Sequence, residues 1–290
     1  MILILALAAT AMPAERIVTI GDTLSARVNG VAVQMRVDPA GTAMPIIDDA
    51  AATRAGLKAG MIGIGYAVGS QNVVGRTALA PIDVGGGPAK HRIGFAPRRF
   101  AGAVEGTIGP AGLPEQIVRF RLHAPRSDER TITLPMGDQG GLAANWAERF
   151  AVVMVGGAPM RIRFDPYHSR TLATAGAAAR LATTNAGTMT GVTGKAEIAF
   201  GIERPVRDMA LGTPLQVGPL SIARLGVRTG DFGSTAGVPT DQADPDEVVV
   251  TAKRKHDPRT DRISIGSDLL DRCSSILFDS ARKQIALTCT

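Results

Sequence analysis

The sequence predicts a mainly β fold of two similar lobes, each a small β-barrel with short helices, related by a pseudo-twofold axis. Three observations support this. The 34 glycines and 18 prolines surround short runs of Val, Ile and Thr, which favours strands and turns over long helices. The chain has 290 residues, 45% of them apolar, enough to fill a substantial core. The same order of motifs also occurs twice, which is typical of paired lobes.

Each copy begins with a strand that ends in Asp-Pro and leads to an alanine-rich helix. The first strand is VAVQMRVDP, residues 31–39, and the helix after it contains AAATRAGL. The second strand is APMRIRFDP, residues 158–166, and the helix after it contains AGAAARLA. Alternating apolar residues predict the strands, and the alanine content predicts the helices. Asp165 therefore corresponds to Asp38, at an offset of 127 residues (165 − 38).

Each copy then continues to a segment built around Ile-Gly, a short helix and final strands. GTIGPAGLPEQIVRFRL, residues 106–122, matches ISIGSDLLDRCSSILFD, residues 263–279, when Gly109 is aligned with Gly266, an offset of 157 (266 − 109). RTITL and KQIAL supply the last strands. The second copy therefore carries 30 additional residues (157 − 127), which fit the Gly-, Pro- and Asp-rich stretch 230–262. We predict that this stretch is an inserted surface loop.

A β-hairpin is expected between these two segments in each copy. NVVGRTALAPIDVG, residues 72–85, and MTGVTGKAEIAFGI, residues 189–202, place glycines between runs of strand-forming residues. We expect one hairpin from each stretch, and we expect one or both hairpins to cover a cleft between the lobes. A cleft between two lobes is a natural place for ligand binding.

These features divide the chain into an N-terminal lobe, residues 15–145, and a C-terminal lobe, residues 146–290. Residues 1–14 are an apolar run followed by small residues, which predicts a signal peptide. A buried first strand is the alternative. The run is too short to cross a bilayer, so no stable membrane span is expected after its removal.

In order and in kind, these motifs resemble the retropepsin and pepsin superfamily, in particular two-lobed bacterial aspartyl proteases. The resemblance runs from about residue 28 to residue 287 and is interrupted by the insert. It implies a bilobal pepsin-like acid-protease fold, with one aspartate from each lobe at a common midline. It also implies that Asp38 and Asp165 are the catalytic pair, with water as nucleophile and with no metal or cofactor.

Both loops depart from the pattern of that family. Asp-Thr-Gly or Asp-Ser-Gly is expected, but proline follows each aspartate, as Pro39 and Pro166, and it supplies neither a hydroxyl nor an N–H group. The next residues are alanine and Tyr167, where glycine normally permits a close approach of two loops. A shift of register would give that role to Gly41, but the second loop has no such glycine. These changes predict that peptidase chemistry is impaired or altered.

Other candidate sites fail on spacing. MTGVTGKA lacks the first glycine and the Ser/Thr of a phosphate loop, and GIGYAVG lacks the last glycine of a dinucleotide fingerprint. The four histidines are too dispersed for a metal site or a catalytic triad. His168 would lie near the cleft or, alternatively, on an exposed loop. We therefore expect no cofactor and no metal.

Charge and cysteine content limit the kinds of partner and the cellular compartment to be expected. The formal charge is +6, but the basic residues are scattered and aromatics make up only 4%, so we expect no nucleic-acid partner. Cys273 and Cys289 would pair in an exported protein, stabilising it by about 3 kcal/mol, or remain free thiols in a reducing compartment. With the predicted signal peptide, this favours a periplasmic or secreted protein of the bacterial envelope.

We therefore expect an exported, aspartic-protease-like protein that binds an extended peptide or protein segment between its lobes. If it is an enzyme, it is an aspartic endopeptidase. The alternative is a non-catalytic envelope protein that binds peptides or acts as a scaffold, in which each aspartate only terminates its strand. The insert 230–262 contains EVVVTA, which resembles a segment near the start of TonB-dependent outer-membrane receptors. It is either a contact for an envelope partner or an ordinary loop strand.

Overall fold

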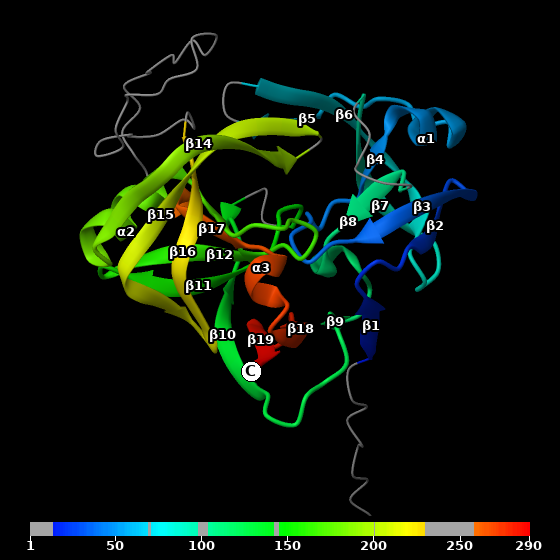
Figure 1. Cartoon of the computed structure of the whole chain (residues 1–290). Helices are drawn as coiled ribbons and strands as arrows, with labels where there is room; N and C mark the ends of the chain where they lie inside the picture. The colour runs from blue at the N-terminus through cyan, green and yellow to red at the C-terminus, as the bar shows by residue number, and fades with distance from the viewer. Residues whose placement is uncertain (1–13, 69–70, 98–103, 142–144, 200, 230–257) are drawn as a thin grey trace, which may run out of the picture.

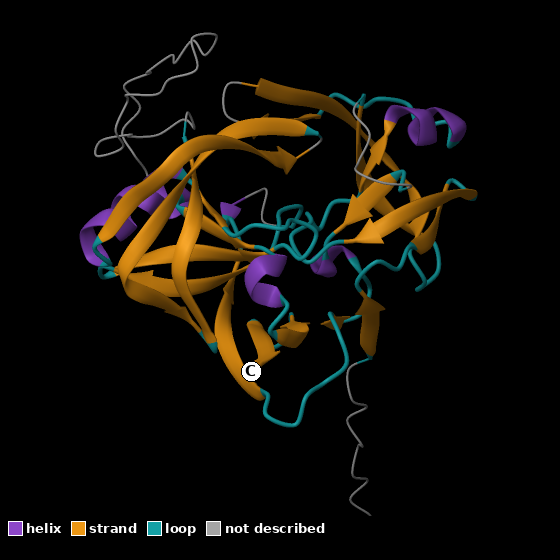
Figure 2. Ribbon diagram, viewed as in Figure 1, coloured by secondary structure: helices purple, strands orange, loops and turns teal. Residues whose placement is uncertain are grey.

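The computed structural model describes residues 14–68, 71–97, 104–141, 145–199, 201–229 and 258–290. The predicted signal peptide, except for its last residue, and residues 230–257 of the predicted insert lie outside the described residues. Strands dominate the described chain and its helices are short, so the predicted mainly β class is confirmed (Figure 2). No helix among the described residues is long and apolar enough to cross a membrane.

The described residues of the first half form ten strands, the helix α1 and the 3-10 turn η1. The strands are β1 (Glu15–Thr19), β2 (Leu24–Val28), β3 (Val31–Val37), β4 (Ile46–Asp48), β5 (Gly63–Val68), β6 (Gln71–Asp83), β7 (Ala89–Ala96), β8 (Gly106–Ile108), β9 (Ile117–Arg121) and β10 (Arg130–Gly137). The helices are α1 (Asp49–Arg54) and η1 (Pro110–Gly112).

The second half repeats this order, and the strands of its hairpin, β14 and β15, are longer than those of the first. Its strands are β11 (Phe150–Val155), β12 (Ala158–Phe164), β13 (Leu172–Ala173), β14 (Gly187–Ala199), β15 (Ile202–Val217), β16 (Leu220–Arg228), β17 (Arg262–Ile265), β18 (Cys273–Asp279) and β19 (Gln284–Cys289). Its helices are α2 (Ala175–Thr184), η3 (Pro258–Thr260) and α3 (Ser267–Leu270).

The strands form two sheets, which give the molecule its two-lobed outline (Figure 1). The seven-stranded sheet has the order β2-β3-β8-β4-β7-β6-β5 and belongs to the first half alone. The twelve-stranded sheet has the order β1-β9-β18-β19-β10-β11-β12-β17-β13-β16-β15-β14. Its first five strands come from the start of the first copy (β1) and from the ends of both copies (β9 and β10, β18 and β19), so they join the lobes. The final strands of the copies pair with each other, with Ile132 opposite Leu287.

The duplication predicted from the sequence is present in the strand pairing. In the first copy β3 runs parallel to β8, with Val37 opposite Ile108, and β8 runs antiparallel to β4. In the second copy β12 runs parallel to β17, with Phe164 opposite Ile265, and β17 runs antiparallel to β13. The helix α1 follows β4 in the first copy, and α2 follows β13 in the second. Both copies therefore hold the end of the Asp-Pro strand in the same way.

The two hairpins differ from their prediction in position. Residues 72–85 were expected to fold back on themselves, but they lie almost wholly in one long strand, β6, which pairs with β5 and β7. Gly75 lies inside β6 and makes no turn. A side chain is excluded there by the neighbouring strand β7, because a Cβ would lie 2.5 Å from the carbonyl oxygen of Phe95. The hairpin is β5–β6 instead. In the second copy β14 and β15 form the hairpin, close to the predicted residues 189–202.

The free ends of the two hairpins meet. Val68 and Val73 from β5–β6 are buried in one apolar cluster with Ile202 from β14–β15, and Tyr66 and Ile198 pack against it. Figure 1 shows β5 and β14 side by side above the region where the lobes face each other. We call this contact between the hairpins, formed by Val68, Val73 and Ile202, the roof of that region.

A disulfide joins Cys273 to Cys289 across the antiparallel pair β18–β19. Of the two alternatives for these cysteines, the structure has the bonded one. The bond lies in the part of the large sheet that joins the lobes, where Phe120 of β9 packs edge-to-face on Phe278 of β18 at 5.7 Å. Both cysteines are buried beside this core.

The glycine after Ile108 makes the tightest backbone contact around the first Asp-Pro loop. A Cβ on Gly109 would lie 2.1 Å from the carbonyl oxygen of Gly41. We expect Gly109→Ala to lower the free energy of unfolding by about 3 kcal/mol, because the backbone cannot give way as a side chain could. Urea unfolding measures the change.

Gly65→Ala is the matched control, because a Cβ at that exposed strand position meets nothing within 4 Å. Its effect should stay within about 1 kcal/mol. Equal unfolding midpoints for the two variants would show that the loop contact is not tight.

Candidate active site

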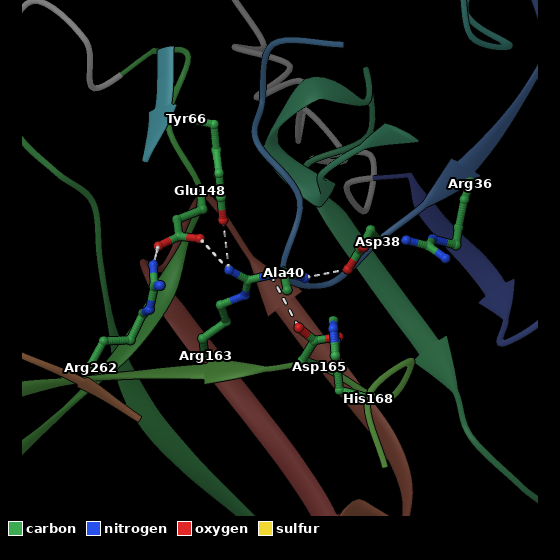
Figure 3. Close-up of polar contacts among 9 residues, drawn as sticks. All are labelled: Arg36, Asp38, Ala40, Tyr66, Glu148, Arg163, Asp165, His168 and Arg262. Carbon is green, nitrogen blue, oxygen red and sulfur yellow. Dashed lines mark hydrogen bonds and ion pairs between the residues drawn. The ribbon is translucent and has the colours of Figure 1, made fainter. Parts of the chain in front are cut away.

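Strand alternation puts an arginine and an aspartate on the same face at the end of each Asp-Pro strand. In β3 the side chains of Val33, Met35 and Val37 are buried in the core, so Arg36 and Asp38 point to the other face. The burial pattern of β12 is nearly the same. There, Arg163 and Asp165 share the face that looks toward the first lobe (Figure 3). Each lobe therefore supplies the same Arg-x-Asp unit.

In the first lobe the backbone and Arg36 hold the Asp38 carboxylate. The Asp38 N–H donates to the carbonyl of Ile108 at 2.9 Å, which anchors the end of the strand. Oδ1 accepts from the Ala40 N–H at 2.8 Å, and Oδ2 accepts from Arg36 at 3.3 Å. The Gly41 N–H donates to the Asp38 carbonyl at 2.8 Å and closes the turn. Although proline follows the aspartate, both carboxyl oxygens therefore have donors.

The second lobe repeats the anchor but changes one donor. The Asp165 N–H donates to the carbonyl of Ile265 at 2.8 Å, matching Asp38 and Ile108. Oδ2 accepts from Arg163 at 3.1 Å, and Oδ1 lies 2.9 Å from Nδ1 of His168. That Nδ1 makes no hydrogen bond of good geometry, so the contact is chiefly an ion pair. The carboxylate is almost fully buried.

Tyr167 occupies the place where a glycine was expected, and it crosses to the other lobe. Its ring stacks on the Arg36 guanidinium, 4.1 Å from centroid to carbon, and its hydroxyl donates to the Val37 carbonyl at 3.5 Å. A bulky residue fits here because its side chain extends from the second Asp-Pro loop to the first lobe and contacts it, so the two Asp-Pro loops need not pack directly against each other. Gly41 in the first loop does make a close backbone contact, since a Cβ there would lie 3.0 Å from the backbone N of Gly109, but this neighbour belongs to the same lobe.

A line of alternating charges continues outward from Asp165. Arg163 lies 3.6 Å from the buried Glu148, and Glu148 accepts from Arg262 at 3.3 Å. Glu148 reaches the midline because its segment pairs with the first loop, opposite Thr42. Tyr66 from the roof hairpin also contacts Arg163, at 3.5 Å. Figure 3 shows this line of side chains and the separate Asp38–Arg36 pair.

The two aspartates have opposite electrostatic environments. Burial and then the charge of Asp165 raise the pKa of Asp38, in spite of Arg36. Burial alone would raise the pKa of Asp165 as well, but Arg163 and His168 outweigh it and hold that pKa below its usual value. The Asp165 carboxylate in turn raises the pKa of His168. Burial and the nearby Asp38 raise the pKa of Tyr167 to about 12. Asp38 therefore keeps its proton to a higher pH than Asp165 does.

The sequence analysis singled out some of these residues and missed others. Asp38 and Asp165 follow equivalent strands of the two lobes, and His168 lies beside Asp165. Arg36 and Arg163 were missed, although the i, i+2 spacing in both copies was a visible signal. Glu148 and Tyr66 carried no signal, because only tertiary pairing brings them in. Among the described residues, no group of three His, Cys, Asp or Glu can hold a metal ion.

The comparisons with known proteins give matches among solved structures only. No protein-family model matches this chain, and no curated protein matches it. Among solved structures, an aspartic proteinase from Irpex lacteus aligns with 92% of this chain and 94% of its own length, at 12% sequence identity and a TM-score of 0.42. A mainly β, two-lobed, pepsin-like fold is the class that the sequence predicts.

The Asp165–His168 pair generates a pH prediction. Asp165→Asn should move the pKa of His168 below its ordinary 6.5, because burial and Arg163 then act on it with little opposition. NMR titration of the His168 ring measures this, with the exposed His91 as internal control. An unchanged His168 midpoint would contradict the assigned ion pair.

The same pair should stabilise the wild type over Asp165→Asn within a limited pH window. The Asp165 contribution is present above the unfolded aspartate pKa, 3.8, and is lost as pH falls through its lowered folded value. The His168 contribution is full below 6.5 and is lost as pH rises through its raised folded value. Urea unfolding of both proteins should show the largest difference between these limits and a smaller one on either side.

Proposed function

We propose that this protein binds extended peptides between its lobes and that its peptidase chemistry, carried by Asp38 and Asp165, is impaired. One observation supports this most: each of the four carboxyl oxygens is already engaged by a group of its own lobe. A water molecule held between the aspartates would have to compete with those groups. The two-lobed arrangement that could hold a peptide is therefore kept, but the carboxylates are less available to bind and activate a shared water molecule.

Peptide binding is supported by the arrangement of strands around the site. The hairpins β5–β6 and β14–β15 meet from opposite lobes, and Tyr66 of the first contacts Arg163 beside Asp165. β5 and β14 are edge strands, so their backbones can pair with an extended chain. In such a complex, main-chain hydrogen bonds supply affinity, and pockets for alternate side chains supply selectivity. The ligand is therefore a peptide or an extended protein segment.

The residual chemistry follows from the opposite pKa directions of the pair. Asp165, which stays ionised, is the base that would take a proton from water, and Asp38, which keeps its proton, is the acid that would donate to the substrate carbonyl oxygen. Hydrolysis would increase as pH rises through the lowered pKa of Asp165. It would decrease as pH rises further through the raised pKa of Asp38.

The impairment has a physical cause in the groups beside Asp165. A carboxylate whose pKa is held down by a cation is a weaker base, and the rate of proton abstraction falls with base strength. Arg163 and His168 both act in this direction. The arginines also fix the carboxylates in their own lobes, so they limit the adjustment that a shared water molecule would need.

Export to the bacterial envelope, to the periplasm or outside the cell, is part of the proposal. The Cys273–Cys289 disulfide supports it, because such bonds persist in oxidising compartments. The signal peptide, residues 1–14, and an envelope partner for the insert, residues 230–262, remain predictions from the sequence.

The central test pairs binding with turnover. Wild type, Asp38→Asn and Asp165→Asn are titrated with a fluorescent library of extended peptides, and cleavage at pH 3 to 7 is followed by mass spectrometry. We expect all three to bind, with slow cleavage by the wild type and at least about 100-fold slower cleavage by both variants, because each removes half of the acid–base pair.

Two outcomes would count against this proposal. Failure of every peptide to bind would remove the function altogether. Binding with equal turnover in wild type and Asp38→Asn would remove the catalytic part, and the protein would then be the non-catalytic envelope protein considered as the alternative.

A second prediction tests the cause of the impairment. His168→Gln removes one of the cations that lower the pKa of Asp165, so we expect cleavage to become about threefold faster. The imidazole is partly exposed, and the substitution should leave the fold intact. His91→Gln, on the exposed side of β7, is the control and should change nothing. Slower cleavage by His168→Gln would mean that His168 assists the reaction.

A further inference from the structure

One face of the hairpin β5–β6 continues from the candidate active site to an exposed surface on β6 and β7. Tyr66 lies opposite Val73 in the β5–β6 pairing, and Leu79 lies opposite Arg92 in the β6–β7 pairing. Val73 and Leu79 are six residues apart on one strand whose register does not shift, so these side chains share a face. Tyr66 contacts Arg163 of the site. Leu79 and Arg92 therefore lie on the face that carries Tyr66 to the site.

Trp146 connects the same surface to the first Asp-Pro loop. Its ring lies beside the Arg92 guanidinium, 5.4 Å from centroid to carbon. Its carbonyl accepts from the Met44 N–H at 3.1 Å, just after that loop. Two residues further along, Glu148 lies 3.6 Å from Arg163. The Arg92–Trp146 pair is thus connected to the site in two ways, through the hairpin and through the segment that contains Trp146.

Apolar side chains are exposed around this arginine. Leu79 is 57% exposed, Ile62 43% and Trp146 37%. Ile62 adjoins the surface because its carbonyl accepts from the Thr77 hydroxyl at 2.6 Å, and the oxygen of that hydroxyl accepts from Arg92 at 2.9 Å. Exposed tryptophan and arginine side chains often supply most of the binding energy where proteins meet their ligands.

Arg92 has no carboxylate within ion-pair distance among the described residues. Its Nη1 donates to Thr77, and its buried Nε has no hydrogen-bond partner in that part of the chain. On this face of β6 the carboxylate is that of Asp83, four positions beyond Leu79, and it accepts from two backbone N–H groups of its own turn. An acidic side chain of a ligand would supply the charge that Arg92 lacks.

We propose that Arg92 and Trp146 form a subsite for an acidic side chain of the bound peptide, with Leu79 and Ile62 in contact with the apolar neighbours of that residue. The inference rests on the proposed peptide binding. A guanidinium binds a carboxylate through charge-assisted hydrogen bonds, which a neutral amide forms less strongly. The ring of Trp146 already restrains the guanidinium by stacking, so less side-chain freedom is lost when the peptide binds.

The first experiment compares matched peptides whose two ends are blocked, so that only side chains carry charge. One extended peptide from the library is prepared with Glu or Gln at each position in turn, and the pairs are titrated by fluorescence anisotropy. We expect Glu to bind about fivefold more tightly than Gln at one position, because the arginine is partly exposed and the gain is moderate. This advantage should shrink at high salt.

Variants assign the advantage to Arg92. Arg92→Gln should reduce it to less than about twofold, and Trp146→Leu, which removes only the stacking ring, should also lower it. Urea unfolding checks that both variants are folded. Arg76→Gln is the matched control, because Arg76 belongs to the same hairpin and stacks on Phe95 at 5.0 Å, but lies on the opposite face of β6. It should keep the full advantage.

Trp146 is the only tryptophan of the chain, so its fluorescence reports on this surface alone. Saturation with the unlabelled Glu peptide should reduce the quenching of Trp146 by acrylamide, since the bound residue covers part of the ring. Arg92→Gln should lose most of this protection, and Arg76→Gln should keep it.

The outcomes separate this inference from the proposed function. Peptides that bind with no acidic advantage at any position would overturn the subsite and leave peptide binding standing. An acidic advantage that survives in Arg92→Gln, or one without protection of Trp146, would also overturn the subsite. Failure of every Glu and Gln peptide to bind would refute the peptide function and the subsite together.

Discussion

Each lobe depends on one parallel strand pairing that ends at an aspartate. The pairing lets the aspartate N–H donate to an isoleucine carbonyl, Ile108 in the first lobe and Ile265 in the second. The residue after each isoleucine is a glycine whose hydrogen leaves room for the returning loop. At Gly266 a Cβ would lie 2.5 Å from the backbone of Arg170. Because these contacts are made by the backbone, the position of each aspartate in its loop does not depend on the partners of its carboxylate.

That constraint explains how much of the molecule the sequence predicts. The alternation of β3 and β12, the glycines 109 and 266 and the helices after them are local features, and each follows from spacing and residue type. The fold class and the equivalence of Asp38 with Asp165 could therefore be predicted. The hairpin at residues 72–85 was wrong, because Gly75 accommodates a neighbouring strand and does not make a turn.

The composition of the site was harder to predict, because its members come together through tertiary contacts. Glu148 arrives through pairing of its segment with the first loop, and Tyr167 is accommodated by reaching the opposite lobe. Only the arginines had a signal in the sequence, since Arg36 and Arg163 stand two residues before each aspartate. Buried carboxylates need compensation, and these two arginines supply part of it for Asp38 and Asp165.

The roof formed by Val68, Val73 and Ile202 joins the lobes a second time, opposite the strands β1, β9, β10, β18 and β19. With both attachments in place, the lobes are joined on two sides of the region that contains Asp38 and Asp165. In the proposed peptide complex, a short peptide would enter this region by one of its ends. The middle of a long chain has no end to insert, so it would enter only after the apolar contact separates and exposes those side chains to water. The hairpin contact would therefore favour chain ends over internal segments of a folded protein.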